Sequence, residues 1–387
     1  MFKLSKKARP EFYNDISSYV IENSKAVWSD RNYTKFAEEA YLKNVIANKA
    51  VSLIATACGS VKFLLKENNQ IANNHPLNKV ILEPNPMDSI SAFIERVVSY
   101  KLLSGNSFIL GNLGVDGALK EIYTLRPDRI KIIEGKGNIP LGYKYKVNEK
   151  EFSYPLDQIS YKSLILHLKS FNPFSDWYGI SQIESARFAI DQHNQASEWN
   201  QALLQNSARP SGALIVKNES YLNEKQFSRL KNEIEQKFSG TINNSRPMIL
   251  EGGLDWKEMS LSPKDMDFIE SKNLSSREIA LAFGVPPQML GIPGDNTYSN
   301  LSEARLSLWE QTILPIMENL TTSLNNWFQK FYPDDNIELS IDKNSIDAVS
   351  EKRHKLWERV EKSTFMTVNE KRQFLGLPNI EGGDRLF

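Results

Sequence analysis

One long amphipathic segment, residues 181–207, constrains the fold more than any other feature of the sequence. Its opposite face carries Gln and Asn in place of charged residues, which favours packing against a neighbouring element. Pro210 ends the segment, because the residue before a proline avoids helical geometry. The residues that return every three to four positions, as one face of an α-helix requires, are Ile183, Ala186, Ile190, His193, Ala196 and Leu203.

The chain before this helix begins with helical patterns. Residues 35–67 predict an amphipathic helix that runs into a short strand. Three prolines between residues 76 and 86 are too many for a helix interior. A second helix follows, with Asp88 and Ser89 as N-cap residues and Gly105 as its stop.

A strand-rich section lies between these helices and the long one. From Ser107 to residue 169 the sequence consists of short apolar runs separated by Gly, Pro or Asn, with Asp116-Gly117 as a hairpin signal. The glycines around Gly111 and Gly114 precede another strand and so predict a β-turn in place of a phosphate loop. Helices and short strands in this order predict an α+β fold.

The second half of the chain predicts an insert followed by helices. Seven basic and seven acidic residues lie between residues 213 and 260, so this strand–helix–strand–strand insert is neutral. Pro263 begins a helix, and Ser275 with Glu278 resembles a second capping box, which predicts two helices in series. Residues 284–294 are too rich in Gly and Pro to be helical.

The last third predicts one more long helix and a small helical tail. Asn300 with Glu303 caps a helix over roughly residues 301–331, with a kink at Pro315, and a strand follows. In the tail, Thr367 and Glu370 form a capping box that opens a helix ending before Pro378.

The residues that usually carry chemistry do not form a recognisable site. No two of the four histidines have metal-ligand spacing, and the hydrolase, zincin and phosphate-loop signatures are absent from the sequence. Asp265 and Asp267 fall in the first turn of a predicted helix, where acidic residues offset the helix dipole. Cys58, the single cysteine, reads as a small buried apolar residue. We therefore predict no catalytic residue, no metal ligand and no cofactor.

The charge balance excludes one class of function. The sequence has 47 Lys plus Arg and 47 Asp plus Glu, whereas a protein that coats phosphates carries an excess of cations. No segment has the roughly 18 uninterrupted apolar residues of a membrane span, and the N-terminus lacks the apolar core of a secretory signal. We expect no membrane partner.

Six motifs in order resemble the portal protein family of tailed bacteriophages, of the type named after coliphage HK-ninety-seven and also found in prophages and gene transfer agents. They run from about residue 25 to the C-terminus. The motifs are NPMDSISAFIERVVSYKLLSGNSFIL with IYTLRPDRI, ILHLKSFNPFSDWYGISQIESA, ARPSGAL, KDMDFIESKNLSSREIALAFGVPPQMLGIPGDNTYSN, LWEQTILPIMENL and TVNEKRQFLGLPNIEGGD.

The resemblance implies a structural protein and not an enzyme. Members form a ring, usually of twelve subunits, at one capsid vertex. Double-stranded DNA is packaged through the ring by terminase and is later ejected, without sequence specificity. The implied partners are other copies of the chain, the terminase large subunit, the major capsid and scaffold proteins, and a head-completion adaptor. The implied location is the virion, with the bacterial host cytoplasm during assembly.

The resemblance also implies a division of the chain into the parts of a portal fold. These are an N-terminal segment 1–25, a wing 26–180, a first stem helix 181–210, a small α/β clip 211–260, a second stem helix 261–283, a tunnel-loop region 284–300, a return to the wing 301–344 and a short helical crown 345–387.

Two sets of site residues follow from this division. The DNA-facing set is Gly294, Asp295, Asn296, Thr297, Tyr298, Ser299 and Asn300. The stem residues expected at the subunit interface are Ile183, Ala186, Ile190, His193, Phe268 and Ile269.

Two other functions compete with this interpretation. One is a soluble metal-dependent or hydrolytic enzyme that uses Asp265, Asp267 and a histidine. The other is a sequence-specific DNA-binding protein, against which the charge balance argues.

Overall fold

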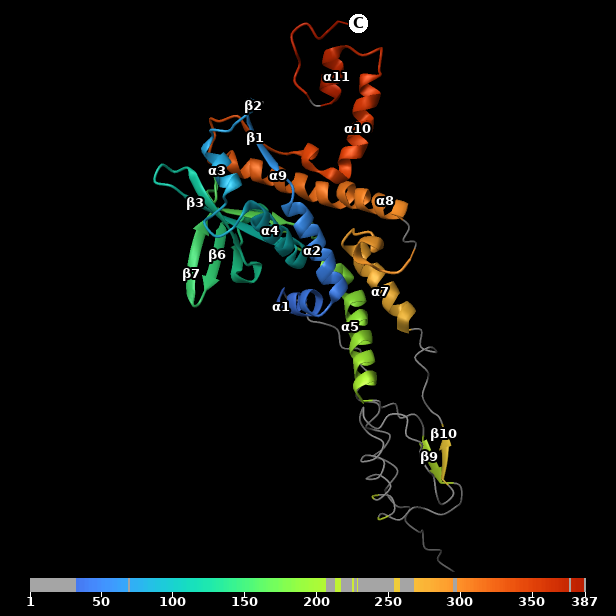
Figure 1. Ribbon diagram of the computed structural model, residues 1–387. Helices are drawn as coiled ribbons and strands as arrows, with labels where there is room; N and C mark the ends of the chain where they lie inside the picture. Colours follow the sequence, from blue (N-terminus) through green and yellow to red (C-terminus); the bar gives the residue numbers. More distant parts are fainter. Residues whose placement is uncertain are drawn as a thin grey trace, which may run out of the picture.

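The structure is a computed structural model that describes residues 33–68, 70–206, 213–216, 225, 228, 254–257, 268–294, 298–375 and 377–385. Helices and small antiparallel sheets form a body, from which the helices α5 and α7 project on one side and a helical tail on the other (Figure 1). The α+β prediction is confirmed.

Helix α2 (Val45–Gly59) lies at the centre of the core and packs on helix α4 (Ile90–Ser104). Its buried side chains are mostly small, and Gly59 has no room for a side chain because a Cβ there would lie 2.8 Å from the Ser91 carbonyl oxygen. Small residues of this kind let two helices approach closely.

The helix predicted to start near residue 35 is divided in two. A short helix α1 (Tyr33–Lys35) continues into a π-helical segment, η1 (Phe36–Leu42), and the chain then bends before α2. Asn44 causes the restart, because its side chain accepts a hydrogen bond from the Ala47 N–H at 2.9 Å.

Two three-stranded sheets account for the predicted β section. The first has the order β4-β3-β8, with strands Leu119–Leu125, Asn106–Leu113 and Ile165–Lys169; the second has the order β5-β6-β7, with strands Ile130–Ile133, Gly142–Val147 and Lys150–Pro155. Short 3₁₀ turns η2 (Pro127–Arg129) and η3 (Lys136–Asn138) lie between strands. The predicted turn at Gly114 to Gly117 is confirmed, since Gly114 N–H bonds the Ala118 carbonyl.

A third sheet joins distant parts of the chain. Strand β1 (Phe63–Glu67) pairs antiparallel with both β2 (Gln70–Ile71) and β11 (Ile337–Ile341). The predicted strand near residue 340 is therefore confirmed, and it returns the chain to its first strand. A separate pair joins β9 (Ala213–Val216) to β10 (Leu254–Lys257), and the rest of the expected insert lies outside the described residues.

The proline-rich stretch between residues 76 and 86 was predicted to be non-helical but contains a short helix. Helix α3 (Pro76–Leu82) has Pro76 in its first turn, where the missing N–H costs nothing, and His75 caps it by accepting from Leu77 N–H at 3.1 Å. The Ser89 cap and the Gly105 stop of α4 are confirmed, with Gly105 in the left-handed conformation at φ 74°.

Helix α7 (Phe268–Ala282) is continuous, so the prediction of two helices in series is wrong. Ser275 does not cap a second helix, because its hydroxyl donates to the Ser271 carbonyl oxygen one turn earlier at 3.0 Å, and Ser276 does the same to Lys272. Hydroxyls that bond back in this way fit inside a helix. The following segment, predicted to be non-helical, contains one 3₁₀ turn, η5 (Pro287–Leu290).

The last long helix starts earlier than predicted and is not sharply broken at its proline. Helix α8 begins at Tyr298 (Tyr298–Leu308), so Asn300 lies in its first turn and is not the cap. A π-helical turn, η6 (Trp309–Ile313), leads into α9 (Leu314–Phe328). Pro315 has no N–H to donate to the preceding turn, and its ring crowds that turn. The wider π-helical turn accommodates both effects.

The tail consists of the turn η7 (Lys343–Ser345) and helices α10 (Asp347–Glu361) and α11 (Val368–Phe374), and its capping box is confirmed. Asn369 ties α11 to the chain end. Its side chain donates to the Ile380 carbonyl and to Asp384, and it accepts from the Ile380 N–H at 2.9 Å. A side chain on Gly383 would collide with this amide, which explains the Gly-Gly-Asp sequence.

Replacing Asn369 by Ala should release the end of the tail. Three hydrogen bonds of a buried amide are lost, and net contributions of about 0.5–1.5 kcal/mol each predict local destabilisation of roughly 2–4 kcal/mol. Hydrogen exchange should show residues 377–385 losing protection while α2 and α4 keep theirs. Gln373→Ala, on an exposed position of the same helix, is the control; equal protection in both variants would contradict the role of Asn369.

Candidate functional site

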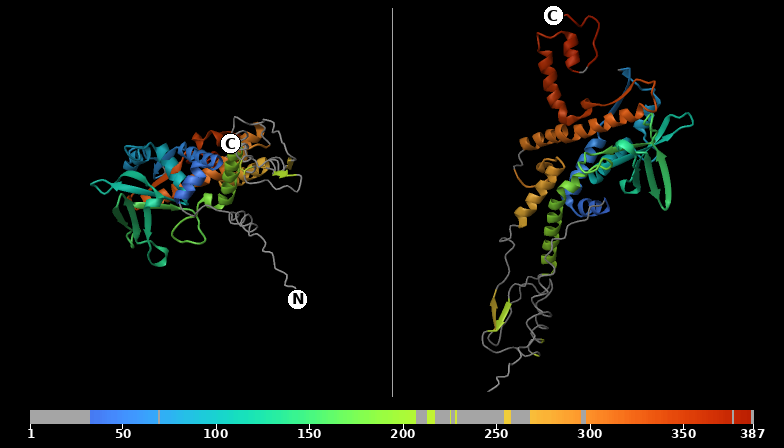
Figure 2. Two further views of the ribbon diagram at one scale, coloured as in Figure 1. Left: turned by 90° about the horizontal axis from the view of Figure 1, so that it is seen from below. Right: turned by 180° about the vertical axis from the view of Figure 1, so that it is seen from behind.

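The paired helices α5 (Gln182–Asn206) and α7 project from the body on the side opposite the helical tail (Figure 2). Ser275 on α7 lies against α5, with its hydroxyl 3.4 Å from the Gln192 side-chain oxygen. The N-terminal turns of α5 and the C-terminal turns of α7 belong to the main core. Both helices therefore begin or end inside the core and extend outward from it.

The apolar stripe of α5 faces inward. Ile183, Ala186, Ile190 and His193 are all buried within the protomer. Within the protomer the chain's own core covers these four side chains, which the resemblance placed at the subunit interface. A helical period shows that a face is buried but does not identify the element that buries it. Exposed positions recur on the other face, at Ser185, Phe188 and Gln195.

A buried polar network fixes α5 to the start of α2. The Asn44 amide donates to the Asn194 side-chain oxygen at 2.9 Å and lies 3.2 Å from Nδ1 of His193. Asn194 donates in turn to the Glu39 carbonyl at 2.8 Å. Burial, together with the nearby Lys272 charge, lowers the pKa of His193, so the neutral ring that can accept from Asn44 is favoured.

Helix α7 has a packed face and an exposed face on opposite sides. Ser275, Ser276, Ile279 and Ala280 are buried, whereas Leu274 and Leu281 are exposed seven residues apart. The side chains of Phe268 and Ile269, the other two expected interface residues, lie outside the described residues although their backbone is helical.

The expected DNA-facing segment is described only at its two ends. Arg277 of α7 donates to the Pro293 carbonyl at 2.6 Å, and its guanidinium lies against Gly294, where a Cβ would displace it. Asn300 is exposed in the first turn of α8. Asp295, Asn296 and Thr297 lie outside the described residues, as do the side chains of Tyr298 and Ser299.

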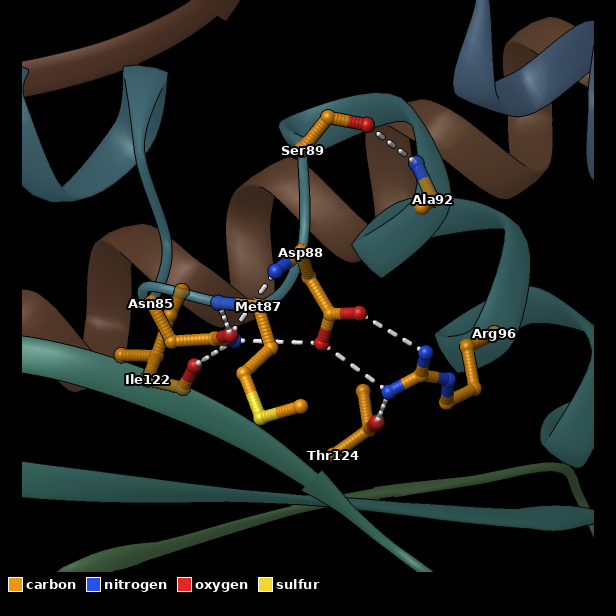
Figure 3. A network of polar contacts seen from close by, with 8 residues as sticks. All are labelled: Asn85, Met87, Asp88, Ser89, Ala92, Arg96, Ile122 and Thr124. Atoms are coloured by element: carbon orange, nitrogen blue, oxygen red, sulfur yellow. Dashed lines mark hydrogen bonds and ion pairs between the residues drawn. The ribbon is translucent and has the colours of Figure 1, made fainter.

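The motif NPMDS forms a hydrogen-bonded turn between α3 and α4 (Figure 3). The Asn85 side chain accepts from the Met87 and Asp88 N–H groups, both at 2.9 Å, and donates to the Ile122 carbonyl of edge strand β4 at 3.0 Å. Asp88 holds Arg96 with two contacts of 2.8 and 2.9 Å. The turn leaves Met87 on the surface and covers part of the sheet edge.

Asn106 organises the far corner of the same sheet. Its side-chain oxygen accepts from Gly179 N–H at 2.8 Å and lies 3.0 Å from Nε2 of His167, and its amide donates to the Gly179 carbonyl at 3.2 Å. His167 stacks on Phe108 with ring centroids 4.3 Å apart. Burial, assisted by the Lys169 charge, lowers the pKa of His167 to about 3.

The alternative of an enzyme depends on Asp265, Asp267 and a histidine. Both aspartates lie outside the described residues, and among the described residues no group of three or more His, Cys, Asp or Glu side chains could hold a metal ion. Cys58 is fully buried, and burial raises the pKa of its thiol to about 12, so it stays protonated at neutral pH.

None of the helices within the described ranges combines the length and apolarity that a bilayer crossing requires.

Comparison with known proteins points to one family. The model of the family described as phage portal protein matches residues 46–376. A protein of Rickettsia bellii is 45% identical over 96% of both chains. The portal protein of Enterobacteria phage HK97 is 24% identical, over 87% of this chain and 79% of its own length.

Solved structures agree with the sequence matches. A chain from the neck of an empty gene transfer agent particle, computed with C6 symmetry, is 36% identical over 92% of this chain and 96% of its own, with a TM-score of 0.72. A chain from the neck of the native particle, computed with C12 symmetry, is 36% identical over 94% of this chain and 99% of its own, with a TM-score of 0.70.

Replacing Asn44 by Ala should weaken the attachment of α5. His193 and Asn194 would lose a buried donor and α2 its N-cap, at a cost of roughly 2–4 kcal/mol in the free energy of unfolding. Urea unfolding measures this change. Gln195→Ala, on the exposed face of α5, should alter stability by less than about 0.5 kcal/mol. A similar, small effect of both substitutions would show that the network does not hold the helix.

His167 should make the body sensitive to acid. Because its folded pKa of about 3 lies below the unfolded value near 6.5, the unfolded state binds the proton first. The contribution to stability is complete above pH 6.5 and falls with pH by up to about 1.4 kcal/mol per unit between 6.5 and 3. The variant His167→Gln should lose this slope between pH 7.5 and 5, as measured by urea unfolding. An unchanged slope would contradict the assignment.

Proposed function

The chain belongs to the phage portal protein family, and on this premise we propose that it assembles into the ring-shaped portal of a phage-like particle. Twelve copies would surround a central channel at one vertex of the capsid. Portal proteins are structural components and not enzymes, so the alternative of a metal-dependent or hydrolytic enzyme has no support from the family.

The observation that carries this proposal is the match over nearly the whole chain to a chain from the neck of a native gene transfer agent particle, a neck computed with C12 symmetry. Its 36% identity extends over 94% of this chain, which includes both the body and the projecting helices. A cyclic ring makes every contact between two different faces of the protomer. The exposed faces of α5 and α7, on opposite sides from their packed faces, supply two such surfaces.

Double-stranded DNA would pass through the channel during packaging and ejection, without sequence specificity. The balance of 47 basic and 47 acidic residues supports passage without retention, because strong phosphate contacts would oppose every step of sliding. The segment 294–300 would face the DNA. A sequence-specific DNA-binding protein would instead show salt-dependent affinity for one duplex.

The further partners follow from this location. The insert 211–260 would act as the clip that contacts the terminase large subunit during packaging and a head-completion adaptor afterwards. The wing, built from residues 26–180 and 301–344, would contact the major capsid and scaffold proteins. Residues 181–210 and 261–283 would be the stem helices, 284–300 would contain the tunnel loop, and 345–387 would be the crown. The chain would occupy the host cytoplasm until the particle is assembled.

The mass of the purified protein tests the proposal. Light scattering should give a species near twelve times the 44.2 kDa of one chain, and negative-stain images should show rings with a central hole. The protein should bind duplex DNA only weakly at physiological salt. A chain without an excess of cations neutralises few phosphates, so few counterions are released from the DNA on binding. A monomer that binds a divalent ion would instead favour an enzyme.

A further inference from the structure

The sheet β5-β6-β7 has one face that packs on the body and one face in water. Ile130 and Tyr143 are buried against Phe108 of the other three-stranded sheet, with the Phe108 and Tyr143 ring centroids 6.1 Å apart. Successive side chains of a strand point to opposite faces, so the residues between the packed positions lie on the water side. The polar residues of this side, which we call the lysine face, are Lys131, Lys144, Lys146, Glu151 and Ser153, all of them exposed.

The three lysines are neighbours on two adjacent strands. Lys131 is directly opposite Lys144 in the register of β5 and β6, and Lys146 follows two residues further along β6. Lys131 and Lys146 are therefore diagonal neighbours, roughly 7–8 Å apart. Like charges that lie directly opposite each other destabilise a sheet. The sheet thus keeps an arrangement of charges that does not favour its own folding.

One carboxylate on the lysine face offsets part of the positive charge. Glu151 forms an ion pair with Lys144, with Nζ and Oε1 2.6 Å apart. The hydrogen bond and charge of Lys144, assisted by the charges of Lys146 and Lys131, lower the pKa of Glu151. Lys131 and Lys146 have no ion-pair partner among the residues that the structure describes. Three lysines against one glutamate leave an excess of two positive charges on this face.

The other acidic residues near the sheet do not cancel this excess. The chain has five lysines and three glutamates between residues 130 and 155. Glu134 follows the end of β5, and Glu149 lies in the turn between β6 and β7, so neither is on the lysine face. Asp176 is exposed on the loop that Tyr178 ties to β5, and it forms no ion pair with any described residue. The sheet therefore carries a local surplus of cations in a chain that is neutral as a whole.

The position of the sheet indicates which side of the assembly it meets. Figure 1 and Figure 2 show β6 and β7 on the side of the body away from α7. The proposed function turns the segment 294–300, which follows α7, toward the DNA. A surface on the other side of the body then faces the proteins that surround the ring. This step rests on the proposed function, whereas the charge of the lysine face does not.

An acidic polypeptide fits the lysine face better than a nucleic acid does. Affinity for duplex DNA comes from neutralising many phosphates, and two surplus charges neutralise few. Single strands are held by bases that stack on aromatic side chains, whereas Tyr143, Tyr145 and Tyr154 belong to the packed face of this sheet. Side chains on one face of an extended polypeptide recur about every 7 Å. That spacing matches the separation of Lys131 and Lys146.

We propose that the lysine face binds an acidic, extended segment of a protein in the shell around the ring. Two carboxylates of that segment, two residues apart, pair with Lys131 and Lys146, while Glu151 holds Lys144. The partner's carboxylates also offset the repulsion between Lys131 and Lys144. Exposed ion pairs are individually weak and are screened by salt, so the contact depends on repetition around the ring for its strength.

Binding of a labelled peptide of alternating Glu and Ser to the full-length protein tests the charge assignment. The double substitution Lys131→Ser and Lys146→Ser should weaken binding by about three- to tenfold, as measured by fluorescence anisotropy at low salt. Stability to urea should be unchanged or higher, because the opposed like charges are gone. Glu151→Gln should strengthen binding, since it removes the one acid of the face.

The matched control removes the same charge from the same sheet. Lys136 lies in the turn η3, and Lys150 alternates with Phe152 away from the lysine face; both are exposed. Lys136→Ser with Lys150→Ser should keep wild-type binding. Equal weakening by the two double substitutions, or equal binding of a peptide with Gln in place of Glu, would contradict the proposal. Tighter binding of a duplex DNA of the same charge, lost on substitution of Lys131 and Lys146, would replace the protein partner by nucleic acid.

Cross-linking with a zero-length carbodiimide, which joins a lysine amine to a carboxylate, locates the contact. Mass spectrometry should find the peptide on Lys131 or Lys146 and not on Lys136 or Lys150. Links spread evenly over the exposed lysines would overturn this inference while wild-type rings persist. A wild type that stays monomeric but takes the peptide at Lys131 and Lys146 would contradict the proposed ring and support the charge assignment.

Discussion

Close packing around α2 is the constraint on which the rest of the structure depends. Its buried residues are mostly small, from Ala47 to Gly59, so α4 and α7 lie against it and share one continuous core with the sheets. Closely packed protein interiors do not tolerate added side-chain volume. The positions of both projecting helices therefore derive from the body, and the pairing of β11 with β1 returns the chain to the same core after those helices.

Buried amide side chains hold three parts of the described structure in fixed positions. The Asn44 network fixes α5, the Asn85 turn joins the segment after α3 to strand β4, and Asn106 fixes Gly179 at the far corner of the sheet. Each uses a buried amide that both donates and accepts, so each has one satisfied arrangement. Parts held in this way keep fixed positions on the body.

Local signals in the sequence predicted where helices begin and end better than they predicted the contacts between elements. The caps at Ser89 and Thr367 and the stop at Gly105 were predictable because each acts through adjacent backbone groups. Ser275 was misread because a hydroxyl that caps a helix and one that bonds back inside a helix have the same sequence pattern. The face of α5 was identified correctly as covered, but its partner was not, because Asn44 lies about 150 positions away in the chain.

The most direct measurement of the central claim is a cryo-electron microscopy map of the assembled protein. It should show a closed ring in which α5 and α7 keep their arrangement on the body to within about 1 Å, as in preorganised complexes. Ile183 and Ile190 should remain inside each protomer, with Leu274 and Leu281 turned away from the packing of their own chain. A ring in which α7 separates from α5, or in which Ile183 and Ile190 contact a neighbouring copy, would contradict the account.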